Sequence, residues 1–509
     1  MRRPPHPAAL AVLITACTIA WGAPSAPAQR STRQPETLED RAERQRLASI
    51  ASAAAAQAFA DRDYRAAKRH LEDQIRHAPQ SFVAHYNMAC ALSKLDDLDA
   101  AEDHLSQAIG YGFSDLHQLR RDDYLAPLRD RELYNDLLRG WPLVLDARKE
   151  ANITRDEQLV PRKRERRTLD PLRLEIISAH DPTATSAAVG ELEALGEWLH
   201  QNVFPTITEE PWHSHHPWVN VVLPDPDAFN DWQIVTFGPE SGAGFSTIGG
   251  AYDHDRKRLV SKDLGATLRH EFVHVLHWRD MSRTGQRHAM WVQEGIAALV
   301  EDYDVSDAGF ITPVPSWRTN MVKRLLDARR LQTLEQLAGT ELDRFSASKP
   351  LAKYAHARAV FLFLNDHGAI PSFFREYEAT YRDDPTGLTA LRRALAVESQ
   401  DQLEDQFRAW VAALPDVPET GDDLTATLGV EIEEGTGDGP KVVRLPSGAR
   451  ERTGLRLGSV ITAIDARPTR DMHELIRILG DYAPGDTVTL HHRRGRIHKT
   501  SDVRLLPRE

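Results

Sequence analysis

Two histidines four residues apart, His270 and His274, constrain this chain more than any other feature of its sequence. They lie in a run from Asp263 to Trp278 that contains no proline and no glycine after Gly265, so we predict a helix there. On a helix that rises about 1.5 Å per residue, residues four apart share one face and lie about 6 Å apart. That spacing allows two imidazole nitrogens to bind a single zinc ion.

Glu271 follows the first histidine and completes an HExxH pattern. In this arrangement the glutamate takes a proton from a water whose pKa the zinc lowers, and it passes the proton to the leaving amine. A pattern this short also arises by chance, so it indicates chemistry only if a further metal ligand accompanies it.

A second predicted helix, Trp291 to Glu301, carries Glu294 at 20 positions after His274. A catalytic zinc keeps three protein ligands and leaves a fourth position for water, and two histidines with one glutamate are a known set. His277 is the alternative third ligand, because it also falls on the face of the two histidines. It lies almost two turns from His270, about 10 Å along the axis. If it is not a ligand, we interpret it as a packed histidine or as one that supports a ligand.

Motif and spacing resemble those of the gluzincin metallopeptidases, whose two helices read HExxH and WxxEGxA. The resemblance implies His270, His274 and Glu294 as ligands of one zinc ion, and Glu271 as the general base. The alternative is a pair of amphipathic helices without chemistry.

Gluzincins commonly place a Tyr or His donor opposite the zinc, where it stabilises the tetrahedral oxyanion. Tyr354, in the run Lys353 to Arg358, is our candidate for this catalytic role. His356 is the alternative candidate. Packing in the core or at the surface is the remaining interpretation of both side chains.

Length and composition bound the class of protein. At 509 residues the chain is too long for one core, and about three or four domains are expected. A chain with 41% hydrophobic and 27% charged residues has ample material for buried cores. The net charge of −12 argues against nucleic acid as a partner, since that would require a basic face.

Residues 1–28 are typical of an export signal, with two arginines near the start, an apolar run from Ala8 to Ala20 and small residues before Gln29. The apolar run is shorter than the roughly 20 residues of a membrane span. In the alternative, Ile14 to Cys17 acts as a bacterial lipobox and Cys17 is lipidated, which is the one case in which we expect membrane contact. We therefore expect an exported protein of the periplasm, cell envelope or extracellular space.

An internal repeat with a period of 34 residues marks residues 43–148. Ala66–Ala67 recurs as Ala100–Ala101, at positions where small residues let helices cross. The pattern resembles two tetratricopeptide repeats followed by a capping segment from Leu125 to Leu138. Such repeats bind peptides or partner proteins and carry no chemistry. The alternative is an unrelated pair of helical hairpins. Cys90 lies in an apolar run here, and we expect it to be buried.

Residues 149–170 are dense in charge and poor in apolar side chains, so we predict a solvated linker.

The gluzincin metallopeptidase domain is expected at residues 171–415. By resemblance to the family, Arg258 to Ser261 is the candidate for the sheet edge along which substrate lies. Between two prolines, the His213, His215 and His216 cluster is predicted to be a surface loop and not a metal site.

Residues 420–509 change character, with short β-rich runs such as Gly454 to Ile461 and a helix from Met472 to Leu479. They resemble a PDZ domain of the bacterial protease type, with Ser459 where Asp is usual. A PDZ domain adds an extended peptide to a sheet edge and captures its terminal carboxylate. By resemblance, Leu428 to Val430 forms that capturing loop.

The predicted fold is therefore multidomain, with α-helical tetratricopeptide hairpins, an α+β zincin-like peptidase domain and a β-rich PDZ domain. We expect a zinc metalloendopeptidase that hydrolyses peptide bonds of envelope or extracellular proteins. The flanking modules are expected to recognise substrates or partner proteins and to take no part in catalysis. The alternative is a catalytically silent peptide-binding scaffold with a structural zinc site, against which an intact Glu271 argues.

Overall fold

The computed structural model describes residues 38–205, 212–238, 249–306, 308–341, 344–345 and 350–508. It is mixed helix and sheet, with several small sheets, which confirms the expected α+β character of a multidomain chain. The predicted export signal at residues 1–28, with Cys17, lies outside the described residues. None of the helices in the described segments is both long and apolar enough to cross a membrane.

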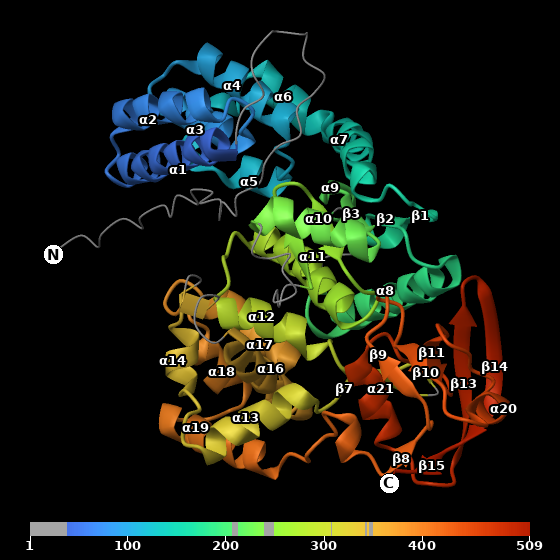
Figure 1. The fold of residues 1–509 in the computed structure, drawn as a ribbon. Coiled ribbons are helices and arrows are strands. Elements are labelled where there is room, and N and C mark those ends of the chain that lie inside the picture. The colour runs from blue at the N-terminus through green and yellow to red at the C-terminus, as the bar shows by residue number, and fades with distance from the viewer. Residues whose placement is uncertain are drawn as a thin grey trace.

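The N-terminal helical region consists of helical hairpins (Figure 1, blue to teal). Helix α2 begins at Tyr64 and α4 at Leu98, 34 residues later, and the small Ala67 and Ala101 at equivalent positions are both fully buried. Cys90 is buried as expected. The bounds are α1 Leu38–Ala60, α2 Tyr64–His77, α3 Phe82–Lys94, α4 Leu98–Tyr111, α5 Leu116–Arg121, η1 Asp123–Leu128, α6 Glu132–Arg139 and α7 Trp141–Asp156.

The segment 149–170 is not the solvated linker that its charge density predicted. Its first part completes α7, and its last part forms strand β1, Glu165–Leu169. The charges are paired: Lys149 lies 2.7 Å and Arg166 3.3 Å from Glu175, whose side chain is fully buried. Partner carboxylates on other elements make this segment part of the fold, and a charge count along the chain cannot reveal them.

A five-stranded sheet forms the next layer, in the order β1-β2-β3-β5-β4. The three inner strands run parallel and the two edge strands run antiparallel to their neighbours. Arg258 to Ser261, predicted to be the substrate edge, is the buried inner strand β5. The edge strand next to β5 is β4, which among the described residues pairs with β5 alone. The bounds are β2 Leu174–Ser178, η3 Asp170–Leu172, α8 Pro182–Asn202, α9 Trp212–His215, β3 Val219–Leu223, α10 Pro226–Phe237, β4 Gly250–Asp253 and β5 Arg258–Ser261.

Helices that follow the sheet share one large hydrophobic core with it (Figure 1, green to orange). Helix α11 lies in the centre of the molecule and α12 packs beside it. The bounds are α11 Ala266–Thr284, α12 Met290–Leu299, β6 Tyr303–Val305, β7 Ile311–Pro313, α13 Trp317–Asp327, α14 Leu334–Ala338, α16 Pro350–Asp366, α17 Ile370–Thr380, α18 Leu388–Ala394 and α19 Gln400–Ala413.

The C-terminal region, residues 424–508, has its own core around a sheet of order β14-β13-β11-β10-β9 (Figure 1, red). Ser459 accepts the backbone N–H of Arg456 at 3.0 Å and so holds the turn before β11. The bounds are β8 Ala426–Thr427, β9 Glu431–Glu433, β10 Lys441–Arg444, α20 Ala449–Thr453, β11 Val460–Ile464, β12 Arg467–Pro468, α21 Met472–Leu479, β13 Thr487–Arg494, β14 Ile497–Arg504 and β15 Leu506–Pro507.

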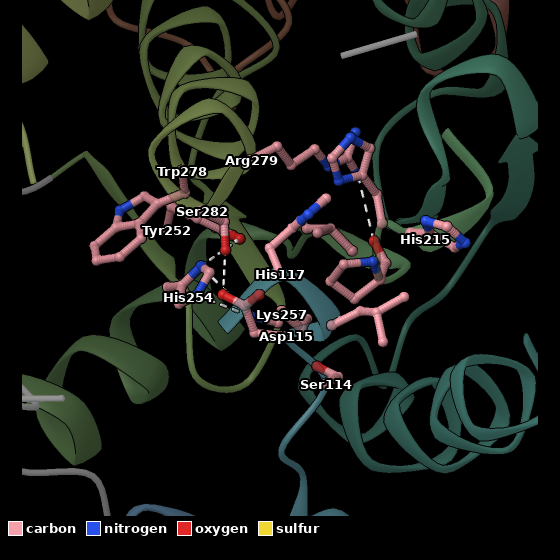
Figure 2. Close-up of a pocket in the computed structure, with 14 residues that line it drawn as sticks. Ser114, Asp115, His117, His215, Tyr252, His254, Lys257, Trp278, Arg279 and Ser282 are labelled. Atoms are coloured by element: carbon pink, nitrogen blue, oxygen red, sulfur yellow. Dashed lines mark hydrogen bonds between the residues drawn. The ribbon is translucent and has the colours of Figure 1, made fainter. Parts of the chain in front are cut away.

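A small cavity separates α5 of the N-terminal helical region from the C-terminal end of α11 (Figure 2). Arg121 closes this contact by donating to the carbonyl of Ser282 at 2.5 Å. His215 and His216 line the cavity, and His216 is only 3% exposed. The predicted surface loop is therefore wrong for these two residues, because the N-terminal helices cover them. The side chain of His213 lies outside the described residues.

The buried Asp156 tests whether α7 and β5 form one folded unit. Its carboxylate is fully buried and accepts from Asn220 at 2.8 Å and Arg258 at 3.2 Å. Asp156→Ala leaves the buried Arg258 without this carboxylate. We therefore expect the free energy of unfolding to fall by about 3–5 kcal/mol. The measurement is the urea midpoint of the full chain. Asp227→Ala is the control, because Asp227 pairs with Arg162 at an exposed site, and equal shifts for the two variants would contradict the account.

Candidate metal centre and active site

Helix α11 carries both histidines of the motif, and polar groups fix its two ends. Asp263 accepts the N–H groups of Gly265 at 2.9 Å and Thr267 at 3.2 Å, which satisfies donors of the first turn. At the other end Gly285 takes a left-handed conformation with a φ of 71°, which suits glycine at a helix C-terminus. The opposite face of the helix is buried in the core, so the two histidines turn toward α12.

Helix α12 brings Glu294 to the histidines, and the glycine that follows it explains how. A Cβ atom on Gly295 would lie 2.8 Å from the carbonyl oxygen of Ala357 and 2.5 Å from the ring of Phe361. Only glycine allows α16 to approach α12 this closely. In the Glu-Gly pair of the motif, Glu294 is the ligand candidate, and Gly295 lies where α12 and α16 cross.

A buried arginine of α16 fixes the end of α12. Arg358 is fully buried, and its guanidinium donates to the carbonyls of Ala298 at 2.9 Å and Val314 at 2.7 Å. The Ala298 carbonyl also accepts the backbone N–H of Glu301 at 3.3 Å, so Arg358 adds to the bonds at the end of α12. The helix that carries Glu294 is therefore held at its C-terminal end.

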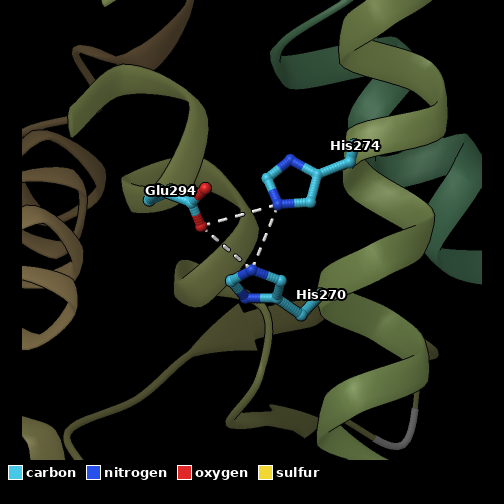
Figure 3. Close-up of side chains that lie close together, drawn as sticks. All are labelled: His270, His274 and Glu294. Carbon is cyan, nitrogen blue, oxygen red and sulfur yellow. Dashed lines mark hydrogen bonds and ion pairs between the residues drawn. The ribbon is translucent and has the colours of Figure 1, made fainter. Parts of the chain in front are cut away.

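The three predicted ligands converge (Figure 3). The Nε2 atoms of His270 and His274 lie 3.2 Å apart, and Glu294 Oε2 lies 3.2 Å from the first and 3.6 Å from the second. A tetrahedral zinc with bonds of 2.0–2.1 Å separates its ligand atoms by about 3.4 Å. Two imidazoles and a carboxylate are also a donor set that zinc prefers. The residues present therefore fit one zinc ion.

Glu301 orients the first histidine, a role that the sequence interpretation did not assign. Its Oε1 accepts from His270 Nδ1 at 2.9 Å, which leaves Nε2 of His270 to face the cluster. Burial alone would raise the pKa of Glu301, but the charge of Arg318 and the bond with His270 hold it at about 2. Arg318 donates to both carboxylate oxygens, at 2.5 and 2.9 Å. The signal was present: Glu301 lies seven residues, or two turns, after Glu294.

Glu271 lies between the histidines and the edge strand β4. It is 9% exposed, and burial raises its pKa while the charges of His270 and His274 lower it. A Cβ on Gly250 of β4 would lie 3.3 Å from Glu271 Cγ, so the strand packs directly on this side chain. The carboxyl group is thus desolvated beside the cluster, without belonging to the ligand set.

Tyr354 lies next to the cluster, whereas His356 does not. The ring centroid of Tyr354 is 6.1 Å from that of His270, and the charge of Glu294, followed by burial, raises the pKa of the phenol. His356 points to the other side of α16 and stacks on Phe407 at 5.5 Å. Residues two apart on a helix face nearly opposite directions, which accounts for the difference.

The alternative third ligand, His277, is bonded elsewhere. It is fully buried, and its Nε2 lies 2.7 Å from Nδ1 of His288. Burial lowers its pKa well below the usual range, and the neighbouring His288 and His274 add to that effect. His277 is a packed core histidine in this structure.

The likeness of this chain to known proteins is distant. No family model and no curated protein matches the chain. Among solved structures, an aminopeptidase N family protein from Idiomarina loihiensis resembles it with 14% sequence identity and a TM-score of 0.25. The match covers 66% of this chain and 65% of that one, so the chain spans less than two thirds of its neighbour. A likeness this distant leaves the assignment of function to the geometry of the site.

Replacement of Glu294 or His277 distinguishes the two candidate ligand sets. Glu294→Ala leaves two protein ligands, and we expect zinc affinity to fall by more than about 100-fold, beyond the usual loss for a supporting residue. His277→Gln should retain one zinc per chain, because His277 binds His288. Metal content after dialysis measures both. Loss of zinc from the His277 variant with retention in the Glu294 variant would refute the assigned set.

Proposed function

We propose that the chain is a zinc metallopeptidase of the gluzincin type that hydrolyses peptide bonds. The observation that carries the proposal is the convergence of His270, His274 and Glu294 around one point, with the desolvated Glu271 beside it. The ligand set leaves one tetrahedral position open, as catalytic zinc sites require.

The residues divide the reaction between them. His270, His274 and Glu294 would hold a zinc ion, which would supply Lewis-acid chemistry by lowering the pKa of water and polarising the scissile carbonyl. Glu271 takes the proton of the attacking water and gives it to the leaving amine, and the raised pKa that burial causes makes it a stronger base for this step. Tyr354 stays protonated because its pKa is raised, so its phenol can donate to the developing oxyanion.

Strand β4 supplies a binding surface for an extended substrate. It is the last strand of its sheet, and all of its residues are partly exposed. In strand addition a peptide bonds to the backbone groups of such an edge strand, which we propose for β4. Because Gly250 packs on Glu271, a peptide along β4 would run past the general base.

The flanking regions are proposed to recognise substrates or partner proteins. Two hairpins repeating at 34 residues support a tetratricopeptide module over residues 43–148, with a groove lined by Lys68, Ile75 and Met88 among others. In residues 420–509, Gly429 with a φ of 66° and the edge strand β9 support a PDZ module. Each offers a surface for peptide binding.

The place of action is proposed to be outside the cytoplasm. The support is the signal-like composition of residues 1–28, with lipidation at Cys17 as the alternative to plain cleavage. Substrates would then be peptides or proteins of the envelope or extracellular space.

Glu271→Gln tests the mechanism without touching a ligand. The variant should keep one zinc per chain and lose turnover of peptides by at least about 10²- to 10⁴-fold, the usual contribution of a positioned acid–base group. Hydrolysis of a quenched fluorescent peptide library measures turnover, and metal analysis measures zinc. Glu197→Gln, an exposed glutamate on α8, is the matched control.

Two outcomes would count against the proposal. Turnover by Glu271→Gln equal to that of the control would refute the assigned base. A chain that binds zinc and cleaves no peptide at all would favour the silent scaffold, in which the metal is structural and the flanking modules provide the function.

A further inference from the structure

The residue before the first metal ligand, Arg269, is buried at 3% exposure. Its guanidinium donates to a carboxylate of the C-terminal region, Glu474 on α21. It also donates to the backbone carbonyl of Glu301 at 2.6 Å. One side chain therefore joins α11, the residue that orients His270, and a region more than 200 residues away in sequence.

The contact is part of a compact buried network. Glu191 on α8 lies 3.4 Å from Arg269 and 2.5 Å from Arg470 of the C-terminal region. Glu474 also accepts the backbone N–H of Arg470 at 2.7 Å. Two guanidinium groups and two carboxylates balance in charge, which is the condition under which buried ions are tolerated.

Backbone contacts bring the C-terminal region to the start of the same helix. The N–H of Leu264 donates to the carbonyl of Gly437 at 2.8 Å, and a Cβ on Gly265 would lie 2.5 Å from Cβ of Arg470. The entry into α11 is thus packed against the C-terminal region, five to six residues before the first histidine ligand.

We propose that Arg269 and Glu474 are positioning residues of the metal centre, so that the C-terminal region sets the geometry of the zinc site. Glu474 fixes the guanidinium of Arg269, which holds the backbone of Glu301. The carboxylate of Glu301 in turn orients His270. The inference rests on the proposed zinc site. It assigns to the C-terminal region a part in the chemistry beyond the recognition of peptides.

Zinc and cobalt binding by the full-length chain test this link. Glu474→Gln should weaken zinc binding by about tenfold, the lower end for residues that support a ligand, and should shift the visible absorption of the cobalt-substituted protein. We expect kcat to fall while KM changes little, because the substrate surface on β4 is untouched. Competition with a chromophoric chelator gives the zinc affinity.

Arg269→Lys separates positioning from charge balance. Lysine keeps the positive charge of the network but lacks the planar guanidinium, whose Nη2 bonds the Glu474 carboxylate and the Glu301 carbonyl while its Nη1 bonds Glu191. Positioning therefore predicts a loss of zinc affinity like that of Glu474→Gln, whereas charge balance alone predicts none. The double variant Arg269→Met with Glu474→Leu removes the link without leaving an unpaired charge, so it guards against simple unfolding.

His498→Gln is the matched control. It removes another contact of the C-terminal region, the 3.0 Å bond to Asp181 at the start of α8, which does not involve α11. Its zinc affinity and cobalt spectrum should equal those of the wild type. Equal losses in the control and in Glu474→Gln would show a general docking effect and overturn the inference.

The inference and the proposed function fail in different ways. Wild-type zinc affinity, cobalt spectrum and kcat in Glu474→Gln and Arg269→Lys would overturn the inference and leave the peptidase proposal intact. Zinc binding without peptidase activity would refute the function, while the cobalt spectra still decide the inference. If the wild type bound neither metal, the zinc site would be refuted and the inference with it.

Discussion

The structure depends on a cluster of ionisable groups buried between α11 and α12. Imidazoles and carboxylates are costly to desolvate unless charge and hydrogen bonds compensate. Burial lowers the pKa of His270, but hydrogen bonds with Glu294 and Glu301 outweigh it and raise the pKa to about 10. This position therefore favours positive charge, which a proton or a metal ion can supply. Arg318 supplies a second compensating charge behind Glu301.

The framework around the cluster consists of close helix contacts. Trp291 is 2% exposed and donates from its indole to the carbonyl of Thr386 at 2.7 Å, while Ile296 is fully buried against the core. These contacts fix the rotation of α12 about its axis, and Gly295 fixes its distance from α16. The position of a ligand on a separate helix depends on how that helix packs. The geometry of the metal site therefore depends on the packing of the core.

Much of the site could be predicted from the spacing of residues along the chain. Helical periodicity alone places His270 beside His274, whereas Glu294 was expected as the third ligand from the resemblance to the gluzincin motif. The structure brings the three ligand candidates together. Strand pairing was less accessible. Residues 250–253 and 258–261 form one hairpin, and the sequence does not say which strand meets β3. The charged segment 149–170 was wrongly predicted to be a linker for a related reason. The residues that pair with its charges lie on other strands and cannot be identified from the local sequence.

Contacts between regions were the hardest to predict. Glu474 lies in an amphipathic helix, where a charged residue normally faces water. Here a second surface, that of α8 and α11, covers it, and Arg269 compensates its charge. Nothing in the local pattern of either segment indicates this pairing. The C-terminal region was expected to be separable from the chemistry, and the structure instead packs it against the helix that carries the metal ligands.

X-ray absorption at the zinc edge tests the central claim most directly, because it reports the ligands of the ion themselves. For the zinc-loaded full-length chain the account predicts about four nitrogen or oxygen neighbours near 2.0–2.1 Å, with the outer-shell signature of two imidazoles. A spectrum with three imidazoles would place His277 or another histidine on the metal. A spectrum with none would contradict the assignment of His270 and His274 altogether.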